Sequence, residues 1–131
     1  MVSQERLPIV EDIYGNHDDI VEEYDLVHDS TGAHFPDRKL QAVIDDARET
    51  GSDYEAAASL LQGLIRRHVF EDGNKRTAWV TSRAFLQRCD REVQVNRDEV
   101  PAVLRAISRY DTEELSRWLR TGEIDRTNLR D

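Results

Sequence analysis

Cysteine and long apolar runs are scarce in this sequence. Cys89 is the single cysteine and cannot form an internal disulfide, which favours a reducing, cytoplasmic location. There is no run of about 18 apolar residues, and the first residues lack the basic end and apolar stretch of a secretory signal. We therefore expect neither a membrane span nor an export signal. The length predicts one domain over residues 1–131.

Lysine is also rare, whereas acidic residues are abundant. Asp and Glu total 27 against 18 Lys and Arg, which gives a net charge of −9, and only Lys39 and Lys75 are lysines. This composition resembles that of proteins from salt-loving organisms, in which strong brine screens the self-repulsion. Because nucleic-acid phosphates repel an acidic chain, we expect no direct nucleic-acid binding.

One segment reverses this charge. Residues 66–76 read RRHVFEDGNKR and carry four basic and two acidic side chains, a net charge of +2. The other 120 residues therefore carry −11. A small cationic island in an acidic protein predicts an anionic ligand.

The spacing of apolar residues predicts an all-α fold, a compact bundle of about six helices. Gly15 and Asn16 offer a break in the first helix, and residues 92–95 alternate like a very short strand or form a loop. Residues 28–36 have loop composition, and the polar tail from about residue 123 is expected to be loose. The predicted helices cover residues 8–28, 37–49, 52–68, 74–89, 98–110 and 111–122.

His68 ends the predicted helix 52–68, on the same face as Leu64 and Ile65. Taken alone, a histidine at this position is more often a core-edge residue that bonds the last carbonyls of its helix. The alternative role of His68 is that of a base that accepts a proton in a reaction.

The next predicted helix begins with two cations. Lys75 and Arg76 lie in its first turn, where the partial positive charge of a helix N-terminus disfavours cations. An anion bound there removes the conflict, because free N–H groups, the flexible Gly73 and two cationic side chains form a phosphate cradle. Asp72 is either a turn residue or a carboxylate that holds Mg²⁺ against such a phosphate. Together these groups suit phosphoryl or nucleotidyl transfer.

Residues 68–76, HVFEDGNKR, also resemble the signature of the Fic/Doc family, His-x-Phe-x-Asp/Glu-Gly/Ala-Asn-Gly/Lys-Arg. The flanking stretches EAAASLLQGLIRRH and TAWVTSRAFLQR resemble the two central helices of that family. The short length and the closing EELSRWLRTGEI resemble its Doc-like branch, the death-on-curing toxins. The resemblance implies a small all-α bundle, in agreement with the apolar spacing.

The resemblance implies a role for each residue of the motif. His68 matches the catalytic base that takes the proton from a target hydroxyl, and Asp72 matches the Mg²⁺ carboxylate. Asn74 and Arg76 match phosphate-binding positions, and the backbone of Gly73 matches the anion cradle. ATP and Mg²⁺ are the implied cofactors.

Neighbouring positions favour the Doc-like branch. Doc-like toxins have Lys at the position of Lys75, where most AMP-transferring relatives have Gly. Those relatives also have a second Arg at the position of Trp79. Arg66 fits a Doc-like phosphate contact, with Arg67 as the alternative. The flap that docks the target usually precedes the motif helix, and residues 49–53 are the candidate.

The function implied is a Doc-like toxin of a toxin–antitoxin pair. It would transfer phosphate from Mg-ATP to a Ser or Thr hydroxyl of a protein target, expected to be a translation elongation factor. An antitoxin in trans, expected to be Phd-type, would restrain it, because the self-inhibitory pattern Ser/Thr-x-x-x-Glu-Gly/Asn is absent. The alternatives are a Fic-type protein AMP or nucleotidyl transferase and a non-catalytic interaction domain.

Overall fold

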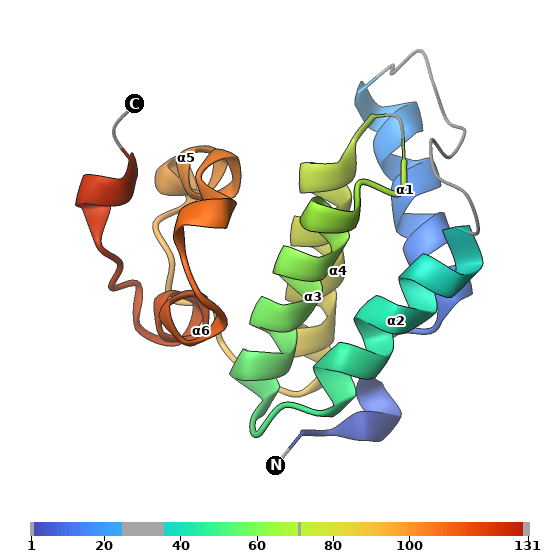
Figure 1. The fold of residues 1–131 in the computed structure, drawn as a ribbon, viewed down its shortest axis with the longest axis horizontal. Coiled ribbons are helices and arrows are strands. Elements are labelled where there is room, and N and C mark those ends of the chain that lie inside the picture. The colour runs from blue at the N-terminus through green and yellow to red at the C-terminus, as the bar shows by residue number, and fades with distance from the viewer. Residues whose placement is uncertain (1, 25–35, 71, 130–131) are drawn as a thin grey trace.

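The regular elements of this protein are helices throughout the part of the chain that its computed structural model describes, residues 2–24, 36–70 and 72–129. Figure 1 shows α3 and α4 side by side in the middle, with α1 and α2 on one flank and α5 and α6 on the other. The all-α prediction of about six helices is therefore confirmed. Across the described ranges, no helix combines the length and the apolar character needed to cross a bilayer.

The helices that flank the charged segment begin and end close to their predicted bounds. The first helix runs unbroken through Gly15, and residues 25–35, which include most of the predicted loop 28–36, lie outside the described ranges. Residues 92–95 form no strand. The α-helices are α1 (Val10–Tyr24), α2 (Pro36–Arg48), α3 (Asp53–Arg67), α4 (Asn74–Arg88), α5 (Val100–Arg105) and α6 (Thr112–Thr121).

The predicted helix 98–110 is in fact three short pieces. A 3-10 turn over Arg97–Glu99 precedes α5, and a second one over Ile107–Arg109 follows it. Pro101 lies in the first turn of α5, where its missing N–H leaves no hydrogen bond unmade. The proline therefore favours a new helix start at this point over one continuous helix.

α3 is the central helix and packs against α2, α4 and α6. Gly63 permits the close approach of α2, because a Cβ built on it would lie 3.0 Å from Cγ1 of Val43. Glycine inside a helix costs about 1 kcal/mol relative to alanine, so close packing of the two helices offsets that cost here. The position of α3 fixes where its C-terminal residue His68 lies.

Side-chain caps define two of the helix starts. The Oγ of Ser52 accepts the N–H of Glu55 at 3.1 Å, but the Glu55 carboxylate accepts the N–H of Gly51 at 3.2 Å, so a reciprocal capping box with Ser52 is not formed. The reciprocal box is complete in α6, between Asp111 and Glu114. Local sequence signals therefore place these two helix starts.

The C-terminal segment differs from the loose tail expected from about residue 123. Arg126 forms an ion pair with Glu99 at 2.7 Å, and the hydroxyl of Tyr110 donates to the carbonyl of Asp125 at 2.8 Å. Leu129 packs against the hydrophobic core. These contacts, made to residues about 15–27 positions away, hold the segment over α5 and its neighbouring turns.

Asp53 is a buried carboxylate that joins the N-terminal segment to the start of α3. It accepts the N–H of Ser3 at 2.8 Å and forms an ion pair with Nε of Arg91 at 3.4 Å. Burial raises the pKa of Asp53, but the hydrogen bonds from Ser3 and Arg91 outweigh it and hold that pKa below its usual value.

Asp53 is expected to make stability depend on pH below about pH 4. Since its native pKa lies below the unfolded value of about 3.9, its stabilising contribution is present above that value and is lost as pH falls through the native pKa. Asp53→Asn should lower the free energy of unfolding at pH 7 by about 1 kcal/mol. Urea titrations between pH 2 and 7 should show a shallower acid loss in the variant than in the wild type. An identical acid slope would contradict this assignment.

Candidate active site

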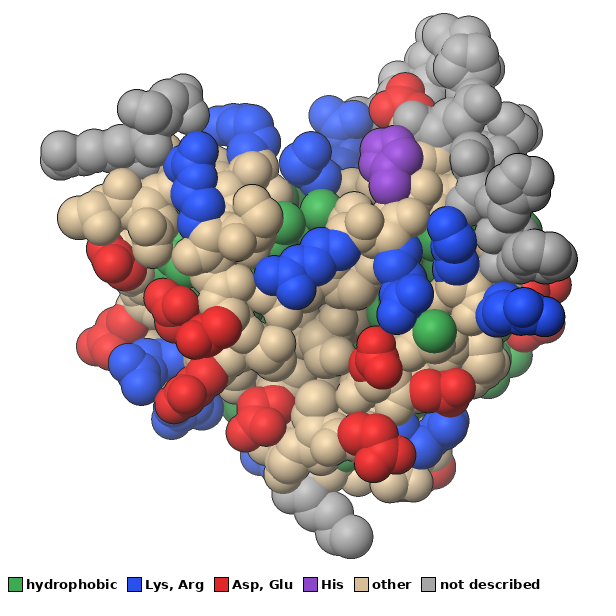
Figure 2. All heavy atoms as spheres, in the orientation of Figure 1, with side chains coloured by type: hydrophobic (Ala, Val, Ile, Leu, Met, Phe, Trp, Pro, Cys, Tyr) green, Lys and Arg blue, Asp and Glu red, His purple; other side chains and the backbone are tan. Residues whose placement is uncertain are grey.

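A cleft of about 600 Å³ opens where the end of α3 meets the start of α4 and faces α5. Figure 2 shows Lys and Arg side chains gathered around a hollow on this face of the molecule. Six of the predicted site residues line the cleft, namely His68, Asp72, Gly73, Asn74, Lys75 and Arg76. The packing of α3, α4 and α5 therefore places much of the cationic segment 66–76 at one cleft.

His68 is the C-cap of α3 and adopts a left-handed backbone conformation with φ 47° and ψ 56°. This conformation costs roughly 1–2 kcal/mol for a residue with a side chain, and it turns the chain sharply out of the helix. The side chain is exposed at the cleft and is not buried at the core edge. The position thus supports the second explanation for this histidine, that of a reactive group.

Asn74 holds the loop between α3 and α4 with its buried side-chain amide. Its Oδ1 accepts the N–H of Phe70 at 3.1 Å, and its Nδ2 donates to the carbonyl of Phe70 at 2.7 Å. These two backbone groups fix the orientation of the amide, so Nδ2 also faces Nδ1 of His68, at 3.3 Å. The side chain of Asn74 is thus engaged within the loop, whereas its backbone N–H lies at the start of α4 without an acceptor in the helix.

The Asn74 contact also determines which nitrogen of His68 carries a proton. Because Nδ2 of Asn74 can only donate, Nδ1 of His68 acts as the acceptor. A neutral His68 in this arrangement carries its proton on Nε2. If Nε2 is to accept a proton from a hydroxyl, the ring must move its proton to Nδ1 and give up the 3.3 Å contact.

The start of α4 has the features of an anion cradle. Gly73 caps the helix in a left-handed conformation with φ 78°, and its carbonyl accepts the first helical hydrogen bond, from Thr77 at 2.9 Å. The N–H groups of Asn74, Lys75 and Arg76 have no acceptor within the helix and lie at its positive end. The exposed side chains of Lys75 and Arg76 add two charges at the same place.

Asp72 precedes the cradle with an exposed carboxylate. Its Oδ1 accepts the N–H of Gly73 at 2.9 Å. Within the described residues, no group of three or more His, Cys, Asp and Glu side chains could hold a metal ion. Asp72 could therefore hold Mg²⁺ only together with water or with the phosphate oxygens of a ligand, which is the usual manner of Mg²⁺ binding.

His17 of α1 contacts the loop between α3 and α4. The sequence alone did not predict this contact. The buried ring of His17 stacks on Phe70 with a centroid distance of 3.7 Å, and its Nε2 donates to the carbonyl of Asp72 at 2.9 Å. Tyr14 packs edge-on against Phe70, and burial together with a hydrogen bond to Asp37 raises the pKa of Tyr14 to about 12. The helical spacing of His17 from Ile13 predicts an inward side chain, but nothing in the sequence indicates its partner 55 residues away.

The wall of the cleft opposite His68 comes from α5 and the middle of α4. Arg105 adds a third cation, which the sequence did not reveal because it lies about 30 residues after the motif. Trp79 is half-buried and packs against Trp118 with a centroid distance of 5.9 Å. The apolar lining of the whole cleft consists of Ile20, Ile65, Val80, Val100, Pro101 and Leu104.

Two expectations are not met by this geometry. Arg66 is exposed and does not line the cleft, and Arg67 pairs with Asp46 at 3.5 Å instead. The candidate flap, residues 49–53, lies at the opposite end of α3 from His68, as Figure 1 shows. The 15 residues of α3 rise by about 22 Å, so this flap lies far from the cleft.

Comparison with known proteins identifies two similarities. A family model described as Fic/DOC family matches residues 7–86, a range that contains α1 to most of α4 and the whole charged segment. A Toxin Doc from Mycolicibacterium smegmatis (strain ATCC 700084 / mc(2)155) is 54% identical over 33 residues. This match covers 25% of the chain and 25% of the relative.

His17→Phe is expected to loosen the loop without unfolding the protein. Phenylalanine keeps a ring against Phe70 but removes the hydrogen bond to the Asp72 carbonyl, a net loss of about 1 kcal/mol. Amide hydrogen exchange of Phe70 and Gly73 should therefore become roughly fivefold faster. Glu22→Gln, on the exposed face of the same helix, is the control and should leave these rates unchanged. Equal exchange in all three proteins would show that the His17 bond contributes nothing to the loop.

Proposed function

The chain belongs to the Fic/DOC family, and we propose that it is a Doc-like toxin that phosphorylates a Ser or Thr hydroxyl of a protein target with Mg-ATP. The observation that carries the proposal is the meeting of the exposed His68 with the cationic start of α4 in one cleft. Members of the family are generally transferases. The similarity to a Toxin Doc supports the toxin assignment.

The proposed reaction needs a base, an anion cradle and a means of charge neutralisation. The target hydroxyl oxygen forms a bond to the γ-phosphorus of ATP, and the bond from that phosphorus to the bridging oxygen breaks, so that ADP leaves. The hydroxyl proton passes to His68. The N–H groups at the start of α4, with Lys75 and Arg76, hold the phosphates in place.

His68 is the proposed base, and Asn74 sets its resting state. Since Nδ2 of Asn74 can only donate, a neutral His68 that keeps this contact accepts at Nδ1 and carries its proton on Nε2. Transfer to Nε2 then requires a change of tautomer when the ligands bind. We propose that this change accompanies occupation of the cradle, since the Asn74 backbone lies at the cradle and its side chain contacts the ring.

Asp72 is the residue proposed to hold Mg²⁺. Its carboxylate is exposed at the cleft, beside the cradle that would hold the phosphates. A bound Mg²⁺ would neutralise charge that develops on the phosphate oxygens. Asp72 needs this ion between itself and the phosphates, because a carboxylate facing them directly would repel them.

Transfer of AMP is the second candidate, because the same cradle also suits an α-phosphate. Backbone N–H groups do not distinguish the α-phosphate from the γ-phosphate. Lys75 can distinguish them, since its side chain fills space and adds charge where a glycine would leave room. This supports a nucleotide bound with its γ-phosphate toward His68.

A translation elongation factor is the proposed target, and an antitoxin in trans, of Phd type, is the proposed restraint. The proposal of both rests on the similarity to a Toxin Doc over a quarter of that protein. A purely structural, non-catalytic role for the motif is less well supported. It would leave the exposure of His68 at the cleft, beside the start of α4, unexplained.

ATP labelled at the α- or γ-phosphate should identify the transferred group. With the γ-label, wild-type protein should place label on a protein target and release ADP. His68→Ala should reduce this transfer by about 10²–10⁴-fold, the usual contribution of a general base, while its circular dichroism stays helical. Label on the target from the α-phosphate would replace the kinase assignment with AMP transfer. Full transfer by the His68→Ala variant would disprove the base assignment.

Asp72→Asn should uncouple nucleotide binding from Mg²⁺. The amide keeps the acceptor for the Gly73 N–H but loses the charge that holds the ion. Calorimetric titration with ADP should show Mg²⁺-dependent binding in the wild type and the same weak binding with or without Mg²⁺ in the variant. Asp19→Asn, an exposed substitution on α1, is the matched control and should behave as wild type. An intact Mg²⁺ response in Asp72→Asn would make Asp72 a turn residue only.

A further inference from the structure

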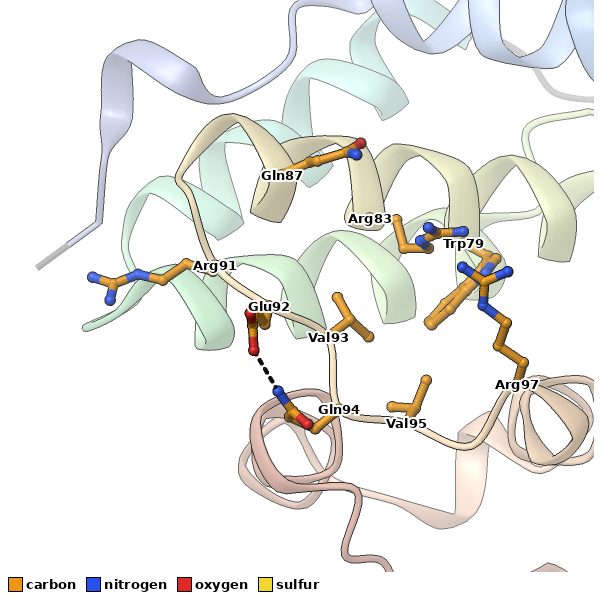
Figure 3. A pocket seen from close by; sticks show the side chains of 9 residues that line it. All are labelled: Trp79, Arg83, Gln87, Arg91, Glu92, Val93, Gln94, Val95 and Arg97. Atoms are coloured by element: carbon orange, nitrogen blue, oxygen red, sulfur yellow. Dashed lines mark hydrogen bonds between the residues drawn. The ribbon is translucent and has the colours of Figure 1, made fainter.

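A second hollow of about 360 Å³ adjoins the candidate active site along α4. Trp79 lines both cavities, so the two hollows meet around one side chain. Figure 3 shows the second hollow between the outer face of α4 and the segment that follows it. Its lining residues are Trp79, Arg83, Gln87, Arg91, Glu92, Val93, Gln94, Val95 and Arg97.

The two hollows concentrate positive charge in an acidic protein. They are lined by six of the 18 Lys and Arg residues but by only two of the 27 Asp and Glu residues. One of those acids, Glu92, is bonded by the side-chain amide of Gln94 at 2.9 Å. This face therefore attracts anions, while the remainder of the chain repels them.

Arg83 and Arg97 are the cations of the second hollow that have no ion pair with another described residue. Arg91 forms an ion pair with Asp53, and in Figure 3 its side chain points away from the hollow. Arg83 and Arg97 instead reach toward Trp79. Over the ranges that the structure describes, no carboxylate lies within 4.0 Å of either guanidinium. Two like charges at one hollow are unfavourable unless an anion lies between them.

The walls of this hollow are fixed by contacts to other helices. The N–H of Gln94 donates to the carbonyl of Leu119 at 3.0 Å, and the hydroxyl of Tyr54 donates to the carbonyl of Glu92 at 2.7 Å. Val93 and Val95 pack against the hydrophobic core. The hollow is therefore preformed, and little ordering is needed when a ligand binds.

The face of α4 that runs along both hollows matches the length of a short extended peptide. Arg76, Trp79, Arg83 and Gln87 follow one another at helical spacing on one face of α4. The 11 positions from Arg76 to Gln87 rise by about 16 Å, which about five residues of extended chain would span. A peptide that lies along this face would thus pass from the cleft at Arg76 to Arg83 within a few residues.

We propose that this second hollow binds an acidic, extended segment of the protein substrate, with an Asp or Glu carboxylate held between Arg83 and Arg97. The inference rests on the proposed function, since it assigns the surface that docks the substrate of that reaction. Arginine forks pair well with carboxylates, and the flat ring of Trp79 offers apolar contact to the peptide. A peptide fits better than a nucleic acid, because the cationic surface is short and the surrounding protein is strongly acidic.

The test uses two fluorescein-labelled peptides of ten residues on the full-length protein. One has a serine followed by glycines and four glutamates, and in the other every glutamate is replaced by glutamine. Anisotropy titrations should show binding of the glutamate peptide only, weakened by salt. Arg83→Gln combined with Arg97→Gln should weaken binding at least tenfold, whereas Arg120→Gln, an exposed position on α6, should not. Equal binding by the double variant would overturn the proposal.

A charge exchange separates docking from any loss of folding. The protein with Arg83→Glu and Arg97→Glu should reject the glutamate peptide and bind a matching lysine peptide. If it binds neither peptide yet unfolds at the wild-type temperature, the two arginines do not form the site. A ten-nucleotide RNA that displaces the glutamate peptide at lower concentration would overturn the proposal in favour of nucleic acid. A wild-type dimer that dissociates in the charge-exchanged variant would overturn it in favour of a second copy of the chain.

The same proteins distinguish this proposal from the proposed function. His68→Ala should bind the glutamate peptide as tightly as wild type, because His68 lies outside the second hollow. Specific peptide binding without any transfer of labelled phosphate would defeat the kinase proposal and leave the docking surface standing. If the paired arginine substitutions leave phosphate transfer to an acidic substrate unchanged, the docking proposal fails and the kinase proposal stands.

Discussion

The buried side-chain amide of Asn74 is the interaction on which the site depends. It bonds both backbone groups of Phe70 and contacts His68, and so it closes the short loop between α3 and α4. Among the described residues of the loop, His68 and Gly73 are left-handed, and the amide bonds help to hold these conformations. The packing of α3 on α4 and the His17 bond to the Asp72 carbonyl place the loop, and the Asn74 amide fixes its backbone between Phe70 and the start of α4. One buried polar group therefore links His68, the proposed base, to the start of α4, the proposed anion cradle.

The charge distribution follows from the same arrangement. Lys75 and Arg76 lie at the positive end of α4, which by itself disfavours cations, and Arg105 of α5 also lines the cleft. The rest of the protein is strongly acidic. An acidic protein with one cationic face directs anions to that face, and high salt weakens this attraction. The placement of a few cations therefore gives the proposed site a charge opposite to that of the rest of the protein.

Much of the fold could be predicted from local signals. The predicted helices 52–68 and 74–89 correspond to α3 and α4 within one or two residues, because Ser52 caps one start and Gly73 the other. The single helix predicted over 98–110 was wrong, because Pro101 favours a new start within it. The tail beyond residue 123 is held by contacts with Glu99 and Tyr110, which no local pattern reveals.

The sequence by itself determined the all-α class and the family, and it placed His68, Asp72 and the cationic start of α4 within a few residues of one another. Their proximity follows from the chain itself, since neighbours along a short turn cannot separate. Only the tertiary structure decided which distant groups join them: His17 beneath the loop, and Arg105 across the cleft. It also left Arg66 and residues 49–53 outside the cleft. Helical periodicity indicates which face of a helix is buried, but the packing of whole helices determines what that face meets.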